Sequence, residues 1–178
     1  MLGTKQPLRN QNTFLTLNDY GCVLTAATRI ANSIIGYEAY SSITANKVGR
    51  DYEIFLLDRS DKMWDITCLD GFASARLINM LLKKEGISQF VSFQGRFYED
   101  FEKILHKYEM DDRKYYVTIR YEGGHTANLT KINIDGKIRY VPTDTSKKNY
   151  RSINYTKIEA IDIFKVIQKN GGERYYER

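Results

Sequence analysis

The chain of 178 residues is 42% hydrophobic and 28% charged, which predicts one globular domain over residues 1–170 and a polar tail at 171–178. Its formal net charge of +5 favours anionic surroundings but is spread along the chain, so a nucleic-acid-binding domain is the least favoured function class. The first twelve residues lack the apolar core of a secretion signal and no apolar run could span a membrane, so we expect a product synthesised in the cytoplasm.

Helical patterns dominate the first half of the chain, after an extended polar arm at residues 1–18. Apolar residues recur every three or four positions, and glycines end the first two patterns at Gly36 and Gly86. The predicted helices cover residues 22–35, 71–84 and 97–110. Residues 37–50 are expected to be irregular or briefly helical, and residues 87–93 are expected to form a short strand.

The second half of the chain is rich in β-forming runs. The predicted strands cover residues 114–121, 126–134, 137–142 and 161–167. Because helices come first and strands follow, the order predicts an α+β fold in which N-terminal helices pack on a C-terminal antiparallel sheet.

Cys22 lies at the start of the first predicted helix, directly after Gly21. Backbone N–H groups and the positive end of the helix dipole would face its sulfur, and both stabilise a thiolate and lower the thiol pKa. A thiolate is a nucleophile, so the position predicts a catalytic cysteine. The alternative is a small buried hydrophobic residue, which is what most free cysteines are.

The second cysteine, Cys68, is predicted to be structural. Asp65 and Asp70 stand close to it in the sequence, and negative charge raises the pKa of a thiol. Both cysteines are expected to be free thiols in a reducing compartment. No cysteine or histidine spacing typical of a metal site is present, so we expect neither a metal nor a cofactor.

A predicted β-hairpin brings a histidine and an aspartate to one face of the sheet. Asp135-Gly136 between two β-rich runs is a strong signal of a two-residue turn, which sets the register of the strands. In that register His125 and Asp144 are diagonal neighbours, about 7–8 Å apart at the backbone and within side-chain reach. Asn128, another candidate partner, has the opposite parity and faces the other side.

A carboxylate bound to the ring favours the imidazolium form, which would stabilise a thiolate. The alternative is a surface His–Asp pair without function, and a one-residue slip would separate the two groups.

Three short segments, in chain order, resemble the papain-like cysteine peptidases. Residues 19–26, Asp-Tyr-Gly-Cys-Val-Leu-Thr-Ala, resemble the YGC-small-T-x-A signature of the bacteriocin-processing (double-glycine leader) peptidase-like group, many of whose members come from phages and bacteria. Gly123-Gly124-His125 resembles the start of that group's histidine strand, and residues 140–144, Tyr-Val-Pro-Thr-Asp, resemble its closing segment. The resemblance spans about residues 11–168. It implies a papain-like fold with a Cys-His-Asp triad.

The chain departs from that group's pattern at two places. Asp144 is not followed by the usual proline, and Thr16 stands six residues before Cys22, where the transporter-linked members carry the glutamine of the oxyanion hole. Gln11 is the nearest upstream glutamine and the candidate for that role, and Asn18 is the runner-up. The backbone N–H of the cysteine can supply part of the oxyanion hole.

These residues together predict a cysteine hydrolase that cleaves an amide bond. Cys22 would be the nucleophile, His125 its ion-pair partner and proton donor, and Asp144 the group that orients the histidine. Three aromatic residues are candidates for the wall of the substrate groove, each with a core position as the alternative: Tyr20, Trp64 and Tyr140.

The substrate class is predicted from the resemblance and from charge. Members that process leader peptides are fused to membrane transporters, whereas stand-alone phage and bacterial relatives cut peptidoglycan. A peptidoglycan endopeptidase of the endolysin type is therefore expected, released to the cell wall by lysis or carried in a phage particle, and the positive charge suits a polyanionic wall. The alternative is a catalytically weak papain-like module that binds a partner, as part of a phage particle or as an inhibitor of a host protein.

Overall fold

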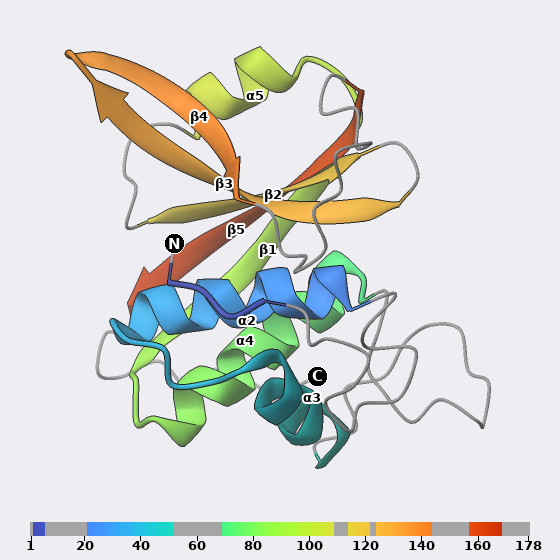
Figure 1. Cartoon of the computed structure of the whole chain (residues 1–178), viewed down its shortest axis with the longest axis vertical. Coiled ribbons are helices and arrows are strands. Elements are labelled where there is room, and N and C mark those ends of the chain that lie inside the picture. Colours follow the sequence, from blue (N-terminus) through green and yellow to red (C-terminus); the bar gives the residue numbers. More distant parts are fainter. Residues whose placement is uncertain are drawn as a thin grey trace.

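The computed structural model has an α+β fold, with helices on both sides of a central sheet (Figure 1). The structure describes residues 2–5, 21–51, 69–108, 114–121, 124–143 and 157–168. Within these ranges, four helices and one five-stranded antiparallel sheet confirm the predicted fold class. No helix in this part of the chain is long and apolar enough to cross a membrane.

Helices α2 and α4 have the bounds that the sequence predicts. α2 runs over Cys22–Ile35 and ends at Gly36, whose φ of 100° is a left-handed conformation that favours glycine. α4 runs over Gly71–Lys84 and follows Asp70, whose side chain accepts a hydrogen bond from a first-turn N–H at 2.6 Å. Between them, α3 occupies Ser42–Asp51, within the stretch expected to be irregular or briefly helical.

The sheet has the strand order β1-β5-β2-β3-β4, and every neighbouring pair is antiparallel. The strands are β1 (Gln89–Phe97), β2 (Tyr115–Tyr121), β3 (His125–Ile134), β4 (Lys137–Thr143) and β5 (Ile158–Gln168). The four C-terminal strands lie close to their predicted bounds. β1 extends beyond the predicted strand at 87–93 because it pairs with β5 over its whole length.

The prediction of a third helix over residues 97–110 is wrong at its start. α5 begins at Phe101 and ends at Lys107, whereas Phe97 is the last residue of β1 and pairs with Ile161. The helical repeat of apolar residues does continue through Phe97, but pairing with β5 places that residue in the sheet. The predicted inner face of the helix still packs on the sheet through Phe101, Ile104 and Leu105.

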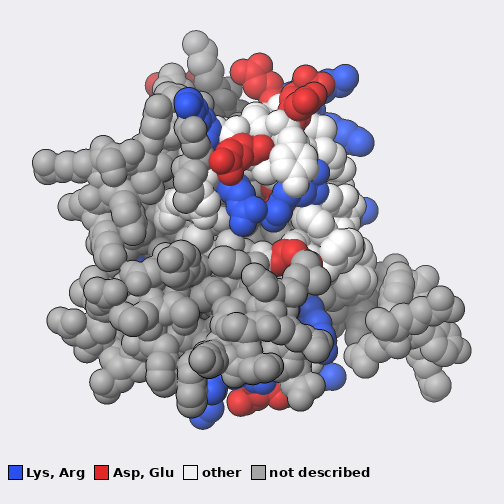
Figure 2. Space-filling view, turned by 90° about the vertical axis from the view of Figure 1, so that its right-hand side faces the viewer, with Lys and Arg blue, Asp and Glu red and all other residues white. Residues whose placement is uncertain are grey.

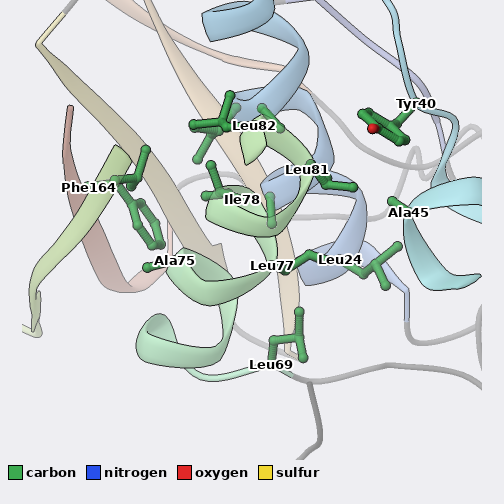
Figure 3. Close-up of a cluster of buried hydrophobic side chains, with 14 of the residues drawn as sticks. Leu24, Tyr40, Ala45, Leu69, Ala75, Leu77, Ile78, Leu81, Leu82 and Phe164 are labelled. Carbon is green, nitrogen blue, oxygen red and sulfur yellow. The ribbon is translucent and has the colours of Figure 1, made fainter. Parts of the chain in front are cut away.

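Two hydrophobic clusters cover the two faces of the sheet. The larger cluster packs α2, α3 and α4 against β1 and β5 and includes the fully buried Leu77, Ile78 and Leu81 (Figure 3). The smaller cluster lies on the opposite face, beneath α5, and includes Ile119 and Ile163. Each fully buried Leu or Ile stabilises the fold by roughly 1.5–3 kcal/mol through removal from water. The packing of the larger cluster therefore holds α2 in place.

The β3–β4 hairpin has the predicted turn and register. Asp135 and Gly136 form the two-residue loop with φ values of 52° and 75°, and a type I′ turn needs positive φ at both positions. The pairing runs from the turn, without a shift, to Asn128 opposite Thr143. This is the register on which the predicted histidine–aspartate pair depends.

Candidate active site

Cys22 is the first residue of α2, and this end of the helix lies against the start of β3. Its side chain is buried, with 7% of its surface exposed. The thiol donates a weak hydrogen bond to the carbonyl oxygen of Gly124, with Sγ at 3.8 Å. Gly124 has a φ of 82°, and this left-handed conformation is the physical reason for a glycine beside the sulfur.

His125 reaches the same sulfur from the first position of β3. Its half-buried side chain forms a hydrogen bond with the side chain of Cys22. Its backbone is held in the sheet because it pairs with Tyr121 of β2. The structure therefore brings together two predicted site residues that are far apart in the chain.

The Cys22 thiol has a pKa below its ordinary value. Burial by itself raises the pKa, because it disfavours the charged thiolate. The side-chain hydrogen bond and the positive charge of His125 lower it, and so do hydrogen bonds from the backbone N–H and the side chain of Thr126. The lowering contributions prevail, so this site favours a thiolate, which is the form that acts as a nucleophile.

Thr126 is a contact of the sulfur that sequence reasoning missed. It follows His125 in β3 and is buried, with 4% of its surface exposed. Alternation along a strand sends its side chain to the face opposite that of the histidine, toward α2. The signal was present in the sequence, because alternation along a strand places the residue after His125 on the other face of the sheet.

Asn128 joins the helix of the nucleophile to the strand of the histidine. Its side-chain N–H donates to the backbone carbonyl of Ala26 in α2 at 3.1 Å, so it faces away from Ala127, as its parity predicts. The side chain is fully buried, and its Oδ1 has no hydrogen-bond partner in the part of the chain that the structure describes. This contact is one link that holds α2 against β3.

Arg29 is a second anchor that the sequence did not reveal. It lies two turns after Cys22 on the same side of α2, and only 2% of its surface is exposed. Its Nε donates to the carbonyl of Thr4 at 2.7 Å and its Nη1 donates to the carbonyl of Thr143 at 3.0 Å. One buried guanidinium therefore links residues 2–5, the helix of the nucleophile and the end of β4.

The other predicted site residues are not brought to the sulfur by the described structure. Tyr140 pairs with Lys131, six residues along β3 from His125, which is roughly 20 Å at the usual rise per residue, so it lies away from Cys22 and its place in a substrate groove stays a prediction. The hairpin register carries the tyrosine along the strand, away from the histidine. The remaining candidates lie outside the described residues: Gln11, Asn18, Tyr20, Trp64 and Asp144, together with Cys68.

The first turn of α2 offers backbone donors at the nucleophile. The N-cap residue is Gly21, which has no side chain to accept hydrogen bonds from the first-turn N–H groups, and the first helical bond runs from Thr25 to its carbonyl at 2.9 Å. These N–H groups and the helix dipole favour negative charge near Cys22. They are donors that could stabilise an oxyanion that forms beside the sulfur.

Charged side chains are mixed on one described face, and the described residues form no metal-binding cluster. Figure 2 shows the side of the molecule on which α2 begins, and described Lys and Arg side chains there lie among Asp and Glu side chains. In the described ranges, no group of three or more His, Cys, Asp or Glu side chains could hold a metal ion.

Comparison with known proteins gives no family for this chain. A scan against protein-family models finds no match. A search of curated proteins finds no matching relative. The chemistry of the site therefore has to be argued from its own geometry: a buried cysteine at a helix start, with a lowered pKa, in contact with a histidine at a strand start.

Proposed function

We propose that the chain is a papain-like cysteine hydrolase that cleaves an amide bond. One observation carries the proposal, namely the hydrogen bond between Cys22 and His125 at a site where the pKa of the thiol is lowered despite burial. A structural cysteine in an apolar environment has the opposite shift, because burial alone raises its pKa. The order of helix-borne cysteine and strand-borne histidine also supports the resemblance to the papain-like group.

The first half of the reaction forms an acyl-enzyme. The Cys22 thiolate attacks the carbonyl carbon of the substrate, forming a C–S bond and moving the carbonyl electron pair onto oxygen. Backbone N–H groups of the first turn of α2 stabilise that oxyanion. His125 as imidazolium then gives its proton to the amide nitrogen, the C–N bond breaks, and the amine leaves behind a thioester.

The second half of the reaction regenerates the thiolate. His125, now neutral, takes a proton from a water molecule while the water oxygen attacks the thioester carbonyl. Collapse of the second oxyanion breaks the C–S bond and releases a carboxylic acid. The thiolate and the imidazolium form again as an ion pair, so atoms and charge balance over the cycle.

The third member of the triad in this proposal is Asp144. The β3–β4 pairing is regular as far as Thr143, the last described residue of β4. The register predicted from the turn, continued by one pair, would set Asp144 opposite Ala127, on the face of His125. A carboxylate there would orient the ring and stabilise its charged form. Asp144→Asn should therefore lower the rate of amide cleavage strongly while Cys22 still accepts an alkylating reagent.

The proposed substrate is the peptide part of peptidoglycan. The support is the net charge of +5, which suits a polyanionic wall, and the resemblance to stand-alone phage and bacterial hydrolases. Purified cell-wall sacculi should lose turbidity with the wild-type chain and keep it with Cys22→Ala. Clearing that survives the substitution would assign the activity to another group, and no clearing by either chain would exclude this substrate.

A limiting dose of iodoacetamide at neutral pH tests the nucleophile without knowledge of the substrate. Mapping of the label should find Cys22 modified well before Cys68, because only a thiolate reacts and the pKa of Cys22 is lowered. Equal or slower labelling of Cys22 would contradict the hydrolase and favour the alternative of a papain-like binding module. Unfolded protein in urea is the reference, since both thiols should then react alike.

A further inference from the structure

Arg120 lies one strand away from the residue that contacts the nucleophile. In β2 it pairs directly with Thr126 of β3 on one side and with Ala160 of β5 on the other. Directly opposed residues of antiparallel strands share a face, with Cβ atoms about 4.5–5.5 Å apart. The long side chain of Arg120 therefore leaves the sheet on the same face as Thr126, which hydrogen-bonds the sulfur of Cys22.

Another arginine on this face, Arg96, already has an ion-pair partner. Arg96 of β1 pairs with Asp162 of β5 and forms a two-pronged ion pair with it, at 2.7 Å and 2.8 Å. This contact raises the pKa of Arg96 further above its ordinary value. The carboxylate of Asp162 is thereby committed to Arg96, although it also lies diagonally across from Arg120 on the same face.

Within the described residues, the Arg120 guanidinium has no such partner. Among the residues that the structure describes, no hydrogen bond or ion pair engages its side chain, and the residue is half-buried rather than fully exposed. The residues that pair directly with Arg120 in the neighbouring strands are a threonine and an alanine, and neither carries a carboxylate. A guanidinium that is partly removed from water and unpaired gains most from a ligand with a carboxylate, which matches its fork of donors.

We propose that Arg120 is a specificity residue that binds a carboxylate of an acidic peptide substrate while Cys22 attacks the amide bond. The inference rests on the proposed hydrolase and names its substrate class. Arg120 takes no part in bond making; it holds the negatively charged part of the substrate beside the nucleophile. An acidic peptide is the ligand class because Arg120, which is unpaired among the described residues, shares a sheet face with Thr126, the residue that contacts the sulfur.

Two small alkylating reagents test this with the intact chain. In both, the thiolate sulfur of Cys22 displaces iodide from a CH₂ group, so an S–C bond forms and a C–I bond breaks. Iodoacetate carries a carboxylate where iodoacetamide carries a neutral amide. The ratio of the two rates at Cys22 therefore measures the attraction of the site for a carboxylate, and the iodoacetamide rate is the internal reference for each variant.

Arg120→Ala should lower the iodoacetate-to-iodoacetamide ratio about two- to fivefold, which is the range that a partly exposed ion pair gives. Arg120→Lys should lower it less, because the charge remains but the two-pronged geometry is lost. If the alanine variant unfolds, Arg120→Gln replaces it, because glutamine removes the charge but keeps a long polar side chain. It should lower the same iodoacetate-to-iodoacetamide ratio. Arg76→Ala is the matched control, since Arg76 is exposed on α4, and it should leave the ratio unchanged.

The two levels of the proposal fail in different ways. An unchanged ratio in folded Arg120→Ala, with fast alkylation of Cys22, overturns the role of Arg120 and leaves the hydrolase standing. Slow alkylation of Cys22 by both reagents in the wild-type chain overturns the hydrolase and, with it, the substrate class inferred here. Equal falls of the ratio in Arg120→Ala and Arg76→Ala would reveal only the loss of net charge and would also overturn the specific role.

Discussion

The buried Arg29 donates from Nη1 to the carbonyl oxygen of Thr143 at 3.0 Å, and this bond joins the helix of Cys22 to the last described residue of β4. Its Nε donates to Thr4 as well, so one side chain satisfies carbonyls from two distant segments. The peptide plane that Arg29 holds through Thr143 is the one that leads into Asp144. In the proposed triad, Arg29 would therefore couple the helix of Cys22 to the backbone that precedes Asp144.

Arg29→Met keeps the volume of the side chain but removes both hydrogen bonds. Each buried acceptor left without a donor costs about 1–3 kcal/mol, so we expect the free energy of unfolding to fall by about 2–4 kcal/mol. Urea unfolding followed by circular dichroism measures this. Arg76→Met, at an exposed position of α4, should change stability by no more than about 0.5 kcal/mol. Equal midpoints for the two variants would show that the Arg29 contacts contribute nothing.

The pH dependence of Cys22 alkylation should change when His125 is removed. In the wild-type chain the lowered pKa keeps the thiol reactive at a pH where an ordinary thiol is protonated. In His125→Ala burial continues to raise the pKa and the main opposing contact is gone, so the rate profile should move to higher pH. Each unit of pKa lowers the thiolate fraction at neutral pH about tenfold.

The control for that profile is the other histidine. His106 is exposed on α5, on the far side of the sheet, and His106→Ala should keep the wild-type profile. An unchanged pH profile after substitution of His125 would mean that this histidine does not lower the pKa of the Cys22 thiol. Rates are measured with iodoacetamide from pH 5 to pH 9 at constant ionic strength.

Thr126 should contribute less to the thiolate than His125 does. Thr126→Val keeps the shape of the side chain and the backbone N–H, and removes only the hydroxyl group that hydrogen-bonds Cys22. We expect a small shift of the alkylation profile to higher pH, in the same direction as for His125→Ala but smaller. Thr126→Ser retains the hydroxyl and should stay near the wild type. A larger shift for Thr126→Val than for His125→Ala would show that Thr126, and not His125, contributes more to the thiolate.

Two glycines with positive φ allow a paired test that distinguishes a loss of stability from a change at the cysteine site. Gly124, with φ 82°, and Gly36, with φ 100°, both have open space around an added Cβ, so alanine at either position costs stability through backbone strain alone, about 1 kcal/mol. Only Gly124 contacts Sγ of Cys22. We therefore expect similar losses in thermal unfolding, and a changed rate of Cys22 alkylation in Gly124→Ala alone. Equal alkylation in the two variants would show that the Gly124 carbonyl has no influence on the sulfur.

Much of the local structure is determined by the sequence itself. The bounds of α2 follow from a helical apolar repeat and a left-handed glycine at Gly36, which depend on residues within a few positions of each other. The hairpin register follows from Asp135-Gly136, because a two-residue turn leaves one way to align its strands. Neither pattern places the helix against the strand, so the contact between Cys22 and His125 is expected only from the resemblance to the papain-like group.

Only the tertiary structure decides the features that depend on distant partners. Phe97 continues a helical repeat but belongs to β1, because the ladder with β5, more than sixty residues later, holds it in the sheet. The buried Arg29 contacts residues 2–5 and the end of β4, which are distant in the sequence. The pairing of Arg120 with Thr126 likewise comes from strand order. Local periodicity encodes each element, whereas pairing across the chain decides which side chains meet beside the sulfur.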